Sequence, residues 1–136
     1  EADGVKAVAS TADLFKACQI VSLHIPATAE TKQSINYSLL SLMPKGALLI
    51  NTARKEVIYE EDLARILEDR TDFHYVADVA PTIADTLKEK FGNRIFFTPK
   101  KMGAQTSEAN INAGIAAARQ SVGYLKDSID KFRVNK

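Results

Sequence analysis

The sequence predicts a Rossmann-like α/β fold, a doubly wound parallel sheet. Along its 136 residues, short apolar runs alternate with amphipathic segments, which is typical of right-handed crossovers between parallel strands. Apolar residues follow one another within the runs instead of alternating with polar ones, as in strands of a sheet that is covered on both faces. Polar or charged residues follow each run, where the ligand crevice of such a sheet lies.

Four apolar runs are expected to form the strands. They are residues 19–24 (QIVSLH), 46–51 (GALLIN), 73–78 (FHYVAD) and 94–98 (RIFFT). Pro26 stops the first run, because proline cannot donate a backbone hydrogen bond. Residues 132–134 allow one more short strand.

Five other segments are expected to be helices. They are residues 13–17 opened by Ser10 or Thr11, 38–43 closed by Pro44, 59–70, 84–91 ended by Gly92, and 106–127. Serine and threonine hydroxyls cap the first turn of a helix, whereas proline and glycine end helices. In the third helix, Leu63, Ile66 and Leu67 recur at the spacing of one helix face. The last helix is the longest and is rich in alanine.

Composition excludes several classes of function. Eighteen lysines and arginines against seventeen acidic residues argue against a nucleic-acid or membrane-surface binder that works by charge. No apolar run approaches the length of a membrane span, and residues 1–3 do not resemble a secretory signal, so we expect a cytoplasmic location. Cys18, the single cysteine, fits a reducing compartment and a small core position.

The two histidines give no metal site. His24 and His74 lie far apart in the sequence, and no cysteine or histidine pair accompanies them. His74 lies within the third apolar run, and we expect it to be a hydrogen-bonded structural residue.

The four strand ends resemble those of the D-isomer-specific 2-hydroxyacid dehydrogenase family, most closely its D-3-phosphoglycerate dehydrogenases. The segments that carry the likeness are 20–35 (IVSLHIPATAETKQSI), 42–54 (LMPKGALLINTAR), the pair Asp78-Val79 and 98–110 (TPKKMGAQTSEAN). Four motifs in the family's order are far more specific than any one of them. The resemblance covers nearly the whole chain and implies an NAD-dependent oxidoreductase.

The resemblance also indicates what this chain does not contain. In the family a glycine-rich phosphate turn precedes these segments, and here the glycines stand at 4, 46, 92, 103, 114 and 123, without G-x-G-x-x-G. Residues 1–128 therefore resemble the carboxyl-terminal half of the NAD-binding domain, with a crossover helix at about 106–127. Residues 129–136 resemble the return segment towards a substrate domain, and we expect this chain alone to be inactive.

By this resemblance Arg54 is the substrate arginine, and Asp78 accepts a hydrogen bond from the nicotinamide carboxamide. A guanidinium fork fits a carboxylate and an adjacent oxygen together. Residue type alone would favour an ordinary surface arginine for Arg54, and for Asp78 a turn residue would be as common as a functional one. Lys55 departs from the glycine that the family has after this arginine. The other expected cofactor contacts are His24, Ile25, Pro26, Thr52, Ala53, Gly103 and Ala104.

The proton carrier is the largest departure from the family, which reads T-P-H-x-G at this point. Here the segment 98–103 (TPKKMG) is one residue longer and has no histidine. Counting back from Gly103 puts Lys101 in the histidine's place, whereas counting from Pro99 puts Lys100 there. We prefer Lys101, because the helix start after Gly103 is the more rigid anchor.

The glutamate that pairs with the family's histidine is also replaced. Ile83 stands five residues after Asp78, where the family has that glutamate. A lysine ammonium, with a reference pKa of about 10.4, is charged without a carboxylate partner. It must be neutral to accept a proton, so we expect the oxidation rate to climb into alkaline pH.

The resemblance implies oxidation of 3-phosphoglycerate by NAD to 3-phosphohydroxypyruvate, the entry to serine biosynthesis, by a homodimer. A sister enzyme acting on glyoxylate, hydroxypyruvate or lactate is the close alternative, and the choice between NAD and NADP stays open. A non-catalytic binding or regulatory protein on the same scaffold is the second hypothesis, because a decayed site would lose both histidine and glutamate.

Overall fold

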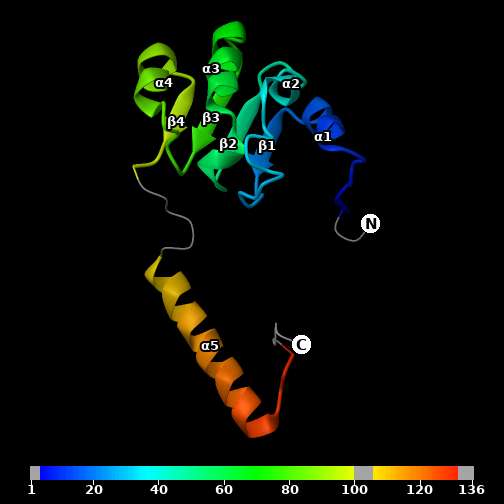
Figure 1. The fold of residues 1–136 in the computed structure, drawn as a ribbon, viewed down its shortest axis with the longest axis vertical. Coiled ribbons are helices and arrows are strands. Elements are labelled where there is room, and N and C mark those ends of the chain that lie inside the picture. Colours follow the sequence, from blue (N-terminus) through cyan, green and yellow to red (C-terminus); the bar gives the residue numbers. More distant parts are fainter. Residues whose placement is uncertain (1–3, 100–105, 132–136) are drawn as a thin grey trace. The chain divides into compact units, whose positions relative to one another are not determined.

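The computed structural model describes residues 4–99 and 106–131, and the chain divides into two compact units, residues 1–101 and 102–136. The first unit is built on one four-stranded parallel sheet, whose strands neighbour each other in chain order (Figure 1). They are β1 (Ile20–Leu23), β2 (Leu48–Asn51), β3 (His74–Ala77) and β4 (Ile95–Phe97). This confirms the predicted Rossmann-like α/β class and all four predicted strands.

Four α-helices accompany the sheet: α1 (Thr11–Ala17), α2 (Tyr37–Leu40), α3 (Glu60–Asp69) and α4 (Ala84–Phe91). Ser10 caps α1, because its Oγ accepts a hydrogen bond from the Asp13 N–H at 3.1 Å. The predicted apolar face of α3 is fully buried. Gly92 follows α4, where a Cβ would lie 2.8 Å from the Lys88 carbonyl oxygen, so only glycine fits without a shift.

One local prediction is wrong, and one short element was not predicted. The helix predicted at 38–43 is a single turn, α2, which Asn36 caps by accepting a hydrogen bond from the Leu39 N–H at 3.2 Å. The α-helix ends early, because the Met43 N–H bonds to the Leu40 carbonyl, which is three residues back as in a turn and not four as in an α-helix. A 3-10 helix, Lys55–Val57, follows β2 and was not predicted, because three residues carry no helical periodicity.

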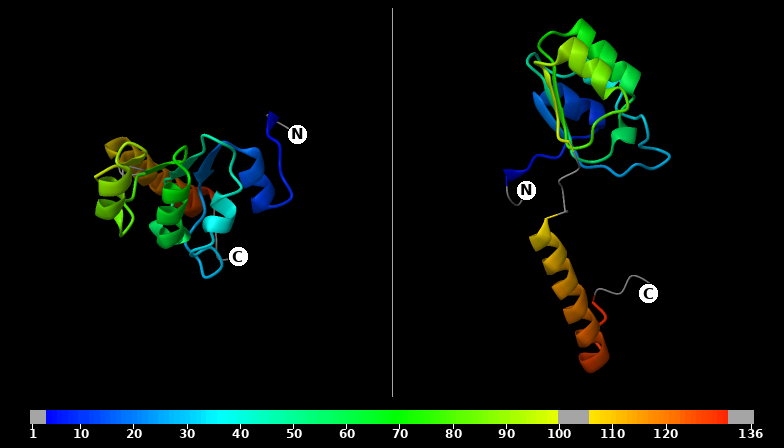
Figure 2. Two further views of the ribbon diagram at one scale, coloured as in Figure 1. Left: turned by 90° about the horizontal axis from the view of Figure 1, so that it is seen from above. Right: turned by 90° about the vertical axis from the view of Figure 1, so that its left-hand side faces the viewer.

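The four α-helices of the first unit lie against one face of its sheet. With strands in chain order and right-handed crossovers, α3 and α4 fall on the same side, as Figure 2 shows from the β4 edge. Alternate strand residues such as Val21, Leu49 and Tyr75 are buried beneath them. On the opposite face Ile20 is 60% and Phe96 59% exposed, so within the described residues the second face is not covered as predicted.

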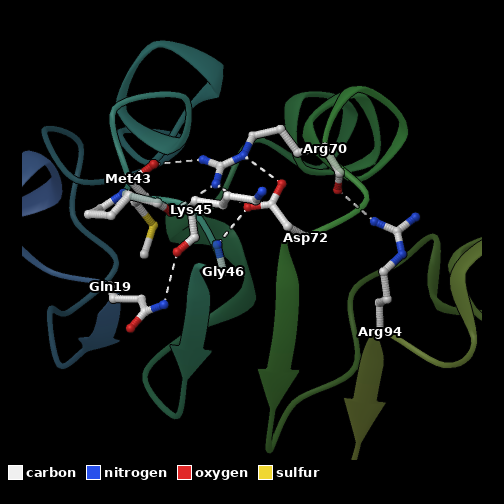
Figure 3. A network of polar contacts seen from close by, with 8 residues as sticks. Gln19, Met43, Lys45, Gly46, Arg70, Asp72 and Arg94 are labelled. Atoms are coloured by element: carbon white, nitrogen blue, oxygen red, sulfur yellow. Dashed lines mark hydrogen bonds and ion pairs between the residues drawn. The ribbon is translucent and has the colours of Figure 1, made fainter.

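A polar network joins the segments that precede the strands (Figure 3). The Arg70 guanidinium donates to the carbonyl oxygens of Met43 and Pro44 and forms an ion pair with Asp72 at 2.6 Å. Asp72 in turn accepts a 2.6 Å hydrogen bond from the Gly46 N–H. These contacts fix the amino-terminal edge of the sheet, opposite the edge where the predicted ligand residues lie.

The second unit contains α5 (Ser107–Asp127), close to the predicted helix at 106–127. Thr106 caps it by accepting from the Ala109 N–H at 3.1 Å, and Ser128 ends it in a left-handed conformation (φ 53°). No residue of α5 is buried. The strand predicted at 132–134 lies outside the described residues. Among the helices that are described, none has the length and apolar character needed to cross a bilayer.

Candidate active site

The carboxyl ends of the four strands lie level with one another. The last residues of the strands are paired across the sheet, Leu23 with Asn51, Asn51 with Ala77, and Ala77 with Phe97. The residues that follow therefore leave the sheet from a single edge. His24, Thr52, Asp78 and Thr98 are those residues.

After β1, His24 is exposed, and its Nε2 lies 2.9 Å from the Ser22 Oγ, which orients the ring. Pro26 follows in a loop that is closed by the Thr31 hydroxyl, which donates to the Pro26 carbonyl oxygen. The loop is tied to the segment after β2, because the Gln33 N–H bonds to the Glu56 carbonyl at 2.9 Å. The predicted contact residues 24–26 thus stand at the rim on a well-defined loop.

After β2, the chain turns sharply through Thr52 and Ala53 to Arg54. The Asn51 side chain closes this turn: its Oδ1 accepts from the Ala53 N–H and its Nδ2 donates to the Arg54 carbonyl, both at 3.0 Å. The exposed Arg54 guanidinium donates to the Ala53 carbonyl at 2.9 Å. It forms no ion pair with a carboxylate of the described ranges, so it is available to an anion.

Lys55, which replaces the family's glycine, fits the turn without backbone strain. Lys55 begins the 3-10 helix after Arg54, which itself has extended backbone angles (φ −142°, ψ 141°). Neither residue has a positive φ. The lysine side chain lines an open groove of about 370 Å³ that Glu60 and Thr82 also border.

After β3, Asp78 is buried, with 9% of its surface exposed. Its backbone is held on both sides, since its N–H bonds to the Asn51 carbonyl at 3.3 Å and its carbonyl accepts from the Thr98 hydroxyl at 3.0 Å. Its Oδ1 finds no hydrogen-bond partner in the part of the chain that the structure describes. Such an oxygen is costly unless a donor satisfies it, so Asp78 is the strongest candidate for a ligand contact.

Ile83 stands where the family has its glutamate, and a glutamate from another segment, Glu60, binds the backbone at this point. The Glu60 carboxylate, from the first turn of α3, accepts from the backbone N–H groups of Thr82 and Ile83 at 2.8 and 3.3 Å. Glu60 thereby holds the loop that leads into α4. Its oxygens are occupied by these two backbone donors, so its first role is to fix this loop.

The segment after β4 is described only in part. Thr98 is placed at the rim by its N–H, which bonds to the Ala77 carbonyl at 3.1 Å. The candidate proton carriers Lys100 and Lys101, and the predicted cofactor residues Gly103 and Ala104, lie outside the described residues.

The described rim fits a nicotinamide cofactor. An unpaired carboxylate oxygen is suited to a carboxamide N–H, and Asp78 presents one. His24 to Pro26 and Thr52 to Ala53 flank the same edge of the sheet.

His74, by contrast, is exposed on the uncovered face, and its ring has no hydrogen bond in the described segments, so its predicted structural bond is not found. Cys18 packs against the core as predicted.

Sequence reasoning missed Asn51 and Tyr75 as parts of the site. Asn51 stood in the NTAR motif, but nothing in the motif reveals that its amide closes the Arg54 turn. Tyr75 lies in another strand, and its hydroxyl is 3.4 Å from the Asn51 Nδ2. Only the register between β2 and β3 brings the two together.

The known proteins that resemble this chain in sequence point to one family. Residues 1–99 match the family described as D-isomer specific 2-hydroxyacid dehydrogenase, NAD binding domain. The D-3-phosphoglycerate dehydrogenase of Haemophilus influenzae is 33% identical over 136 residues, covering 96% of this chain and 33% of that protein. D-3-phosphoglycerate dehydrogenase 2 of Arabidopsis thaliana, a chloroplastic protein, is 36% identical over 129 residues, covering 93% of this chain and 19% of that protein.

A solved structure extends the similarity over the whole chain. The crystal structure of NAD⁺-bound 3-phosphoglycerate dehydrogenase from Entamoeba histolytica superposes with a TM-score of 0.82 at 45% identity, covering 100% of this chain and 46% of that one. The chain thus spans less than half the length of each of these three relatives. By the match of residues 1–99, the chain belongs to the D-isomer specific 2-hydroxyacid dehydrogenase family and carries part of its NAD-binding domain.

Proposed function

We propose that the protein containing this chain oxidises 3-phosphoglycerate to 3-phosphohydroxypyruvate with NAD, as an entry to serine biosynthesis. The observation that carries the proposal is the buried Oδ1 of Asp78, which has no hydrogen-bond partner among the described residues, at the same sheet edge as the Arg54 guanidinium, which has no carboxylate partner among them. Similarity to phosphoglycerate dehydrogenases supports the choice of substrate. We further propose a homodimer, as is usual in this family, and a cytoplasmic location.

Each proposed site residue has a distinct task. NAD, when bound, supplies the ring carbon that accepts a hydride from the substrate's C2. Asp78 accepts a hydrogen bond from the carboxamide and so orients the ring. Arg54 binds the substrate carboxylate through its planar fork. Lys101, neutral beforehand, accepts the proton of the C2 hydroxyl as the carbonyl forms.

Arg54 offers the most direct test of the reaction. In the complete polypeptide, Arg54→Ala should raise the KM for 3-phosphoglycerate by about tenfold to a hundredfold, the range expected for losing a charge-assisted hydrogen bond. The affinity for NADH, followed by its fluorescence, should stay unchanged. Arg65→Ala is the control, because Arg65 lies on the exposed side of α3, where it pairs with Asp69 and stacks on the Tyr37 ring.

Two outcomes would contradict the proposal. Preference for glyoxylate, hydroxypyruvate or D-lactate over 3-phosphoglycerate would assign the protein to a sister enzyme. NADH binding without turnover of any 2-hydroxy acid would favour the non-catalytic alternative. That alternative rests in part on the replacement of the family's glutamate by Ile83.

A further inference from the structure

We propose that Asn51 and Tyr75 act together as positioning residues for Arg54, forming a buried amide–hydroxyl pair that sets where the substrate arginine leaves the sheet. This inference rests on the proposed function, because that function assigns Arg54 to the substrate. Each side chain is only 1% exposed, so neither is open to the substrate.

The Asn51 amide has three partners, and two of them belong to the Arg54 turn. Its Oδ1 accepts from the Ala53 N–H, and its Nδ2 donates to the Arg54 carbonyl. The second Nδ2–H points to the Tyr75 hydroxyl at 3.4 Å. The peptide group before Ala53 and the one after Arg54 are therefore tied to one buried side chain, and the turn cannot rotate without breaking buried hydrogen bonds.

The Tyr75 ring is itself held by a residue of the next strand. The register places Tyr75 beside Leu49 in β2, two positions before Ala77, the neighbour of Asn51. Its ring packs edge-on against Phe97 of β4, with centroids 5.7 Å apart and planes at 66°. Tyr75 thus gives the Asn51 amide a fixed polar contact, backed by the strand that leads towards the lysine segment.

The chemistry of the pair suits a permanent support. Burial raises the pKa of Tyr75 to about 12, so its hydroxyl stays neutral at any working pH and remains a constant partner for the amide. An asparagine in an apolar core is costly unless its groups are satisfied, and an apolar side chain would fill the same space. The amide is therefore best explained by the turn that it closes.

Positioning matters because the Arg54 side chain is otherwise weakly held. Its guanidinium is exposed and bonds only to the adjacent Ala53 carbonyl among the described contacts. The direction of its backbone therefore sets the region that the guanidinium can reach. A shift of the turn should weaken substrate binding strongly while leaving the Asp78 contact to the cofactor in place.

The kinetic test compares three variants of the complete polypeptide. Asn51→Leu should raise the KM for 3-phosphoglycerate about tenfold and Tyr75→Phe about threefold, with the NADH dissociation constant changed less than twofold. Asn51→Asp keeps the acceptor for Ala53 but loses both donors, so it should fall near Asn51→Leu. Tyr37→Phe is the matched control, because its hydroxyl bonds to exposed Asp69 away from the site.

Hydrogen exchange of the Ala53 amide, in the same proteins, separates this proposal from the proposed function. We expect faster exchange in Asn51→Leu and no change in Tyr37→Phe. Unchanged protection in a folded Asn51→Leu variant, or faster exchange with an unaltered KM, would overturn the positioning role. Tyr75→Phe provides the same test if Asn51→Leu does not fold. Faster exchange in a protein that turns over no 2-hydroxy acid would overturn the proposed function alone.

Discussion

Asp78 combines two properties that rarely occur together at a purely structural position. It is buried at the end of a strand, and one of its carboxylate oxygens has no partner in the described ranges. An unsatisfied buried polar atom costs about 1–3 kcal/mol of stability. A cofactor carboxamide would recover that cost on binding, so stability and function should respond oppositely to a change at this residue.

Asp78→Asn tests this opposition. The neutral amide keeps the shape and an acceptor oxygen, but it costs less to bury unpaired and binds a donor less strongly. We expect the ligand-free protein to be stabilised by about 1 kcal/mol, measured by urea unfolding, and NADH to bind about tenfold more weakly. Glu89→Gln, on the exposed side of α4, should change neither quantity. A destabilised variant with unaltered NADH affinity would make Asp78 a structural residue.

The proton carrier is tested by alanine substitution and pH. Lys101→Ala should abolish turnover with NAD, whereas Lys100→Ala should retain it. Because a lysine must be neutral to accept the hydroxyl proton, the oxidation rate of the unaltered enzyme should climb above pH 8. Initial rates between pH 6 and pH 10 measure this. A plateau already at neutrality would exclude a lysine, and the reverse pattern in the two variants would select Lys100.

At the scale of the elements, charged hydrogen bonds tie together the segments at the amino-terminal edge of the sheet. Arg70 and Asp72 tie the turn before β2 to the segment after α3, and Arg94 donates to the carbonyls of Leu67 and Arg70 at the end of that helix. Gly46 makes the turn possible, since it has a φ of +75° and a Cβ there would lie 2.8 Å from the Gln19 side chain.

This network predicts a loss of stability in acid. The Arg70 guanidinium, together with the Gly46 N–H, holds the pKa of Asp72 well below its usual range. A lowered pKa stabilises the folded state above the pKa of the unfolded chain, and this contribution is lost as pH falls below about 4. Urea midpoints at pH 7 and pH 3 should therefore differ less in Asp72→Asn than in the unaltered protein.

A matched exposed carboxylate provides the control for this acid effect. At pH 7, Asp72→Asn should cost about 1 kcal/mol, while Glu68→Gln, which breaks the exposed pair with Lys90, should cost less than about 0.5 kcal/mol. Equal losses in the two variants would show that the network adds nothing beyond an ordinary surface ion pair.

The elements show which features can be predicted from sequence. α4 was predicted with its observed limits because an amphipathic run ends at a required glycine. The rim residues Arg54 and Asp78 were also predicted, since each follows a strand. The 3-10 helix, the single turn of α2 and the Asn51–Tyr75 pair were not, because they depend on side-chain caps and strand register. Tertiary contacts between distant segments leave no local periodicity.

At the scale of the whole molecule, the chain holds only some of the parts that an NAD site needs. Its sequence contains the rim residues but no G-x-G-x-x-G turn to cradle a pyrophosphate. One sheet face in the described residues exposes Ile20 and Phe96 and borders a shallow cavity of about 440 Å³. Parallel sheets are normally covered on both faces, so exposed apolar area of this kind favours association.

The 136-residue chain produced alone should therefore bind NADH at least a hundredfold more weakly than the complete polypeptide, because anion binding at a glycine-rich turn supplies much of a dinucleotide's affinity. Fluorescence titration measures the NADH dissociation constants of both proteins. Equal NADH affinity in the two proteins would mean that the rim residues suffice for binding, and the role assigned to a separate phosphate turn would then be wrong.

The uncovered face of the sheet should bind a hydrophobic dye. Phe96→Ser should reduce the dye signal without unfolding the chain, because Phe96 points away from the core. Lys88→Ser, at an exposed position on α4, is the control.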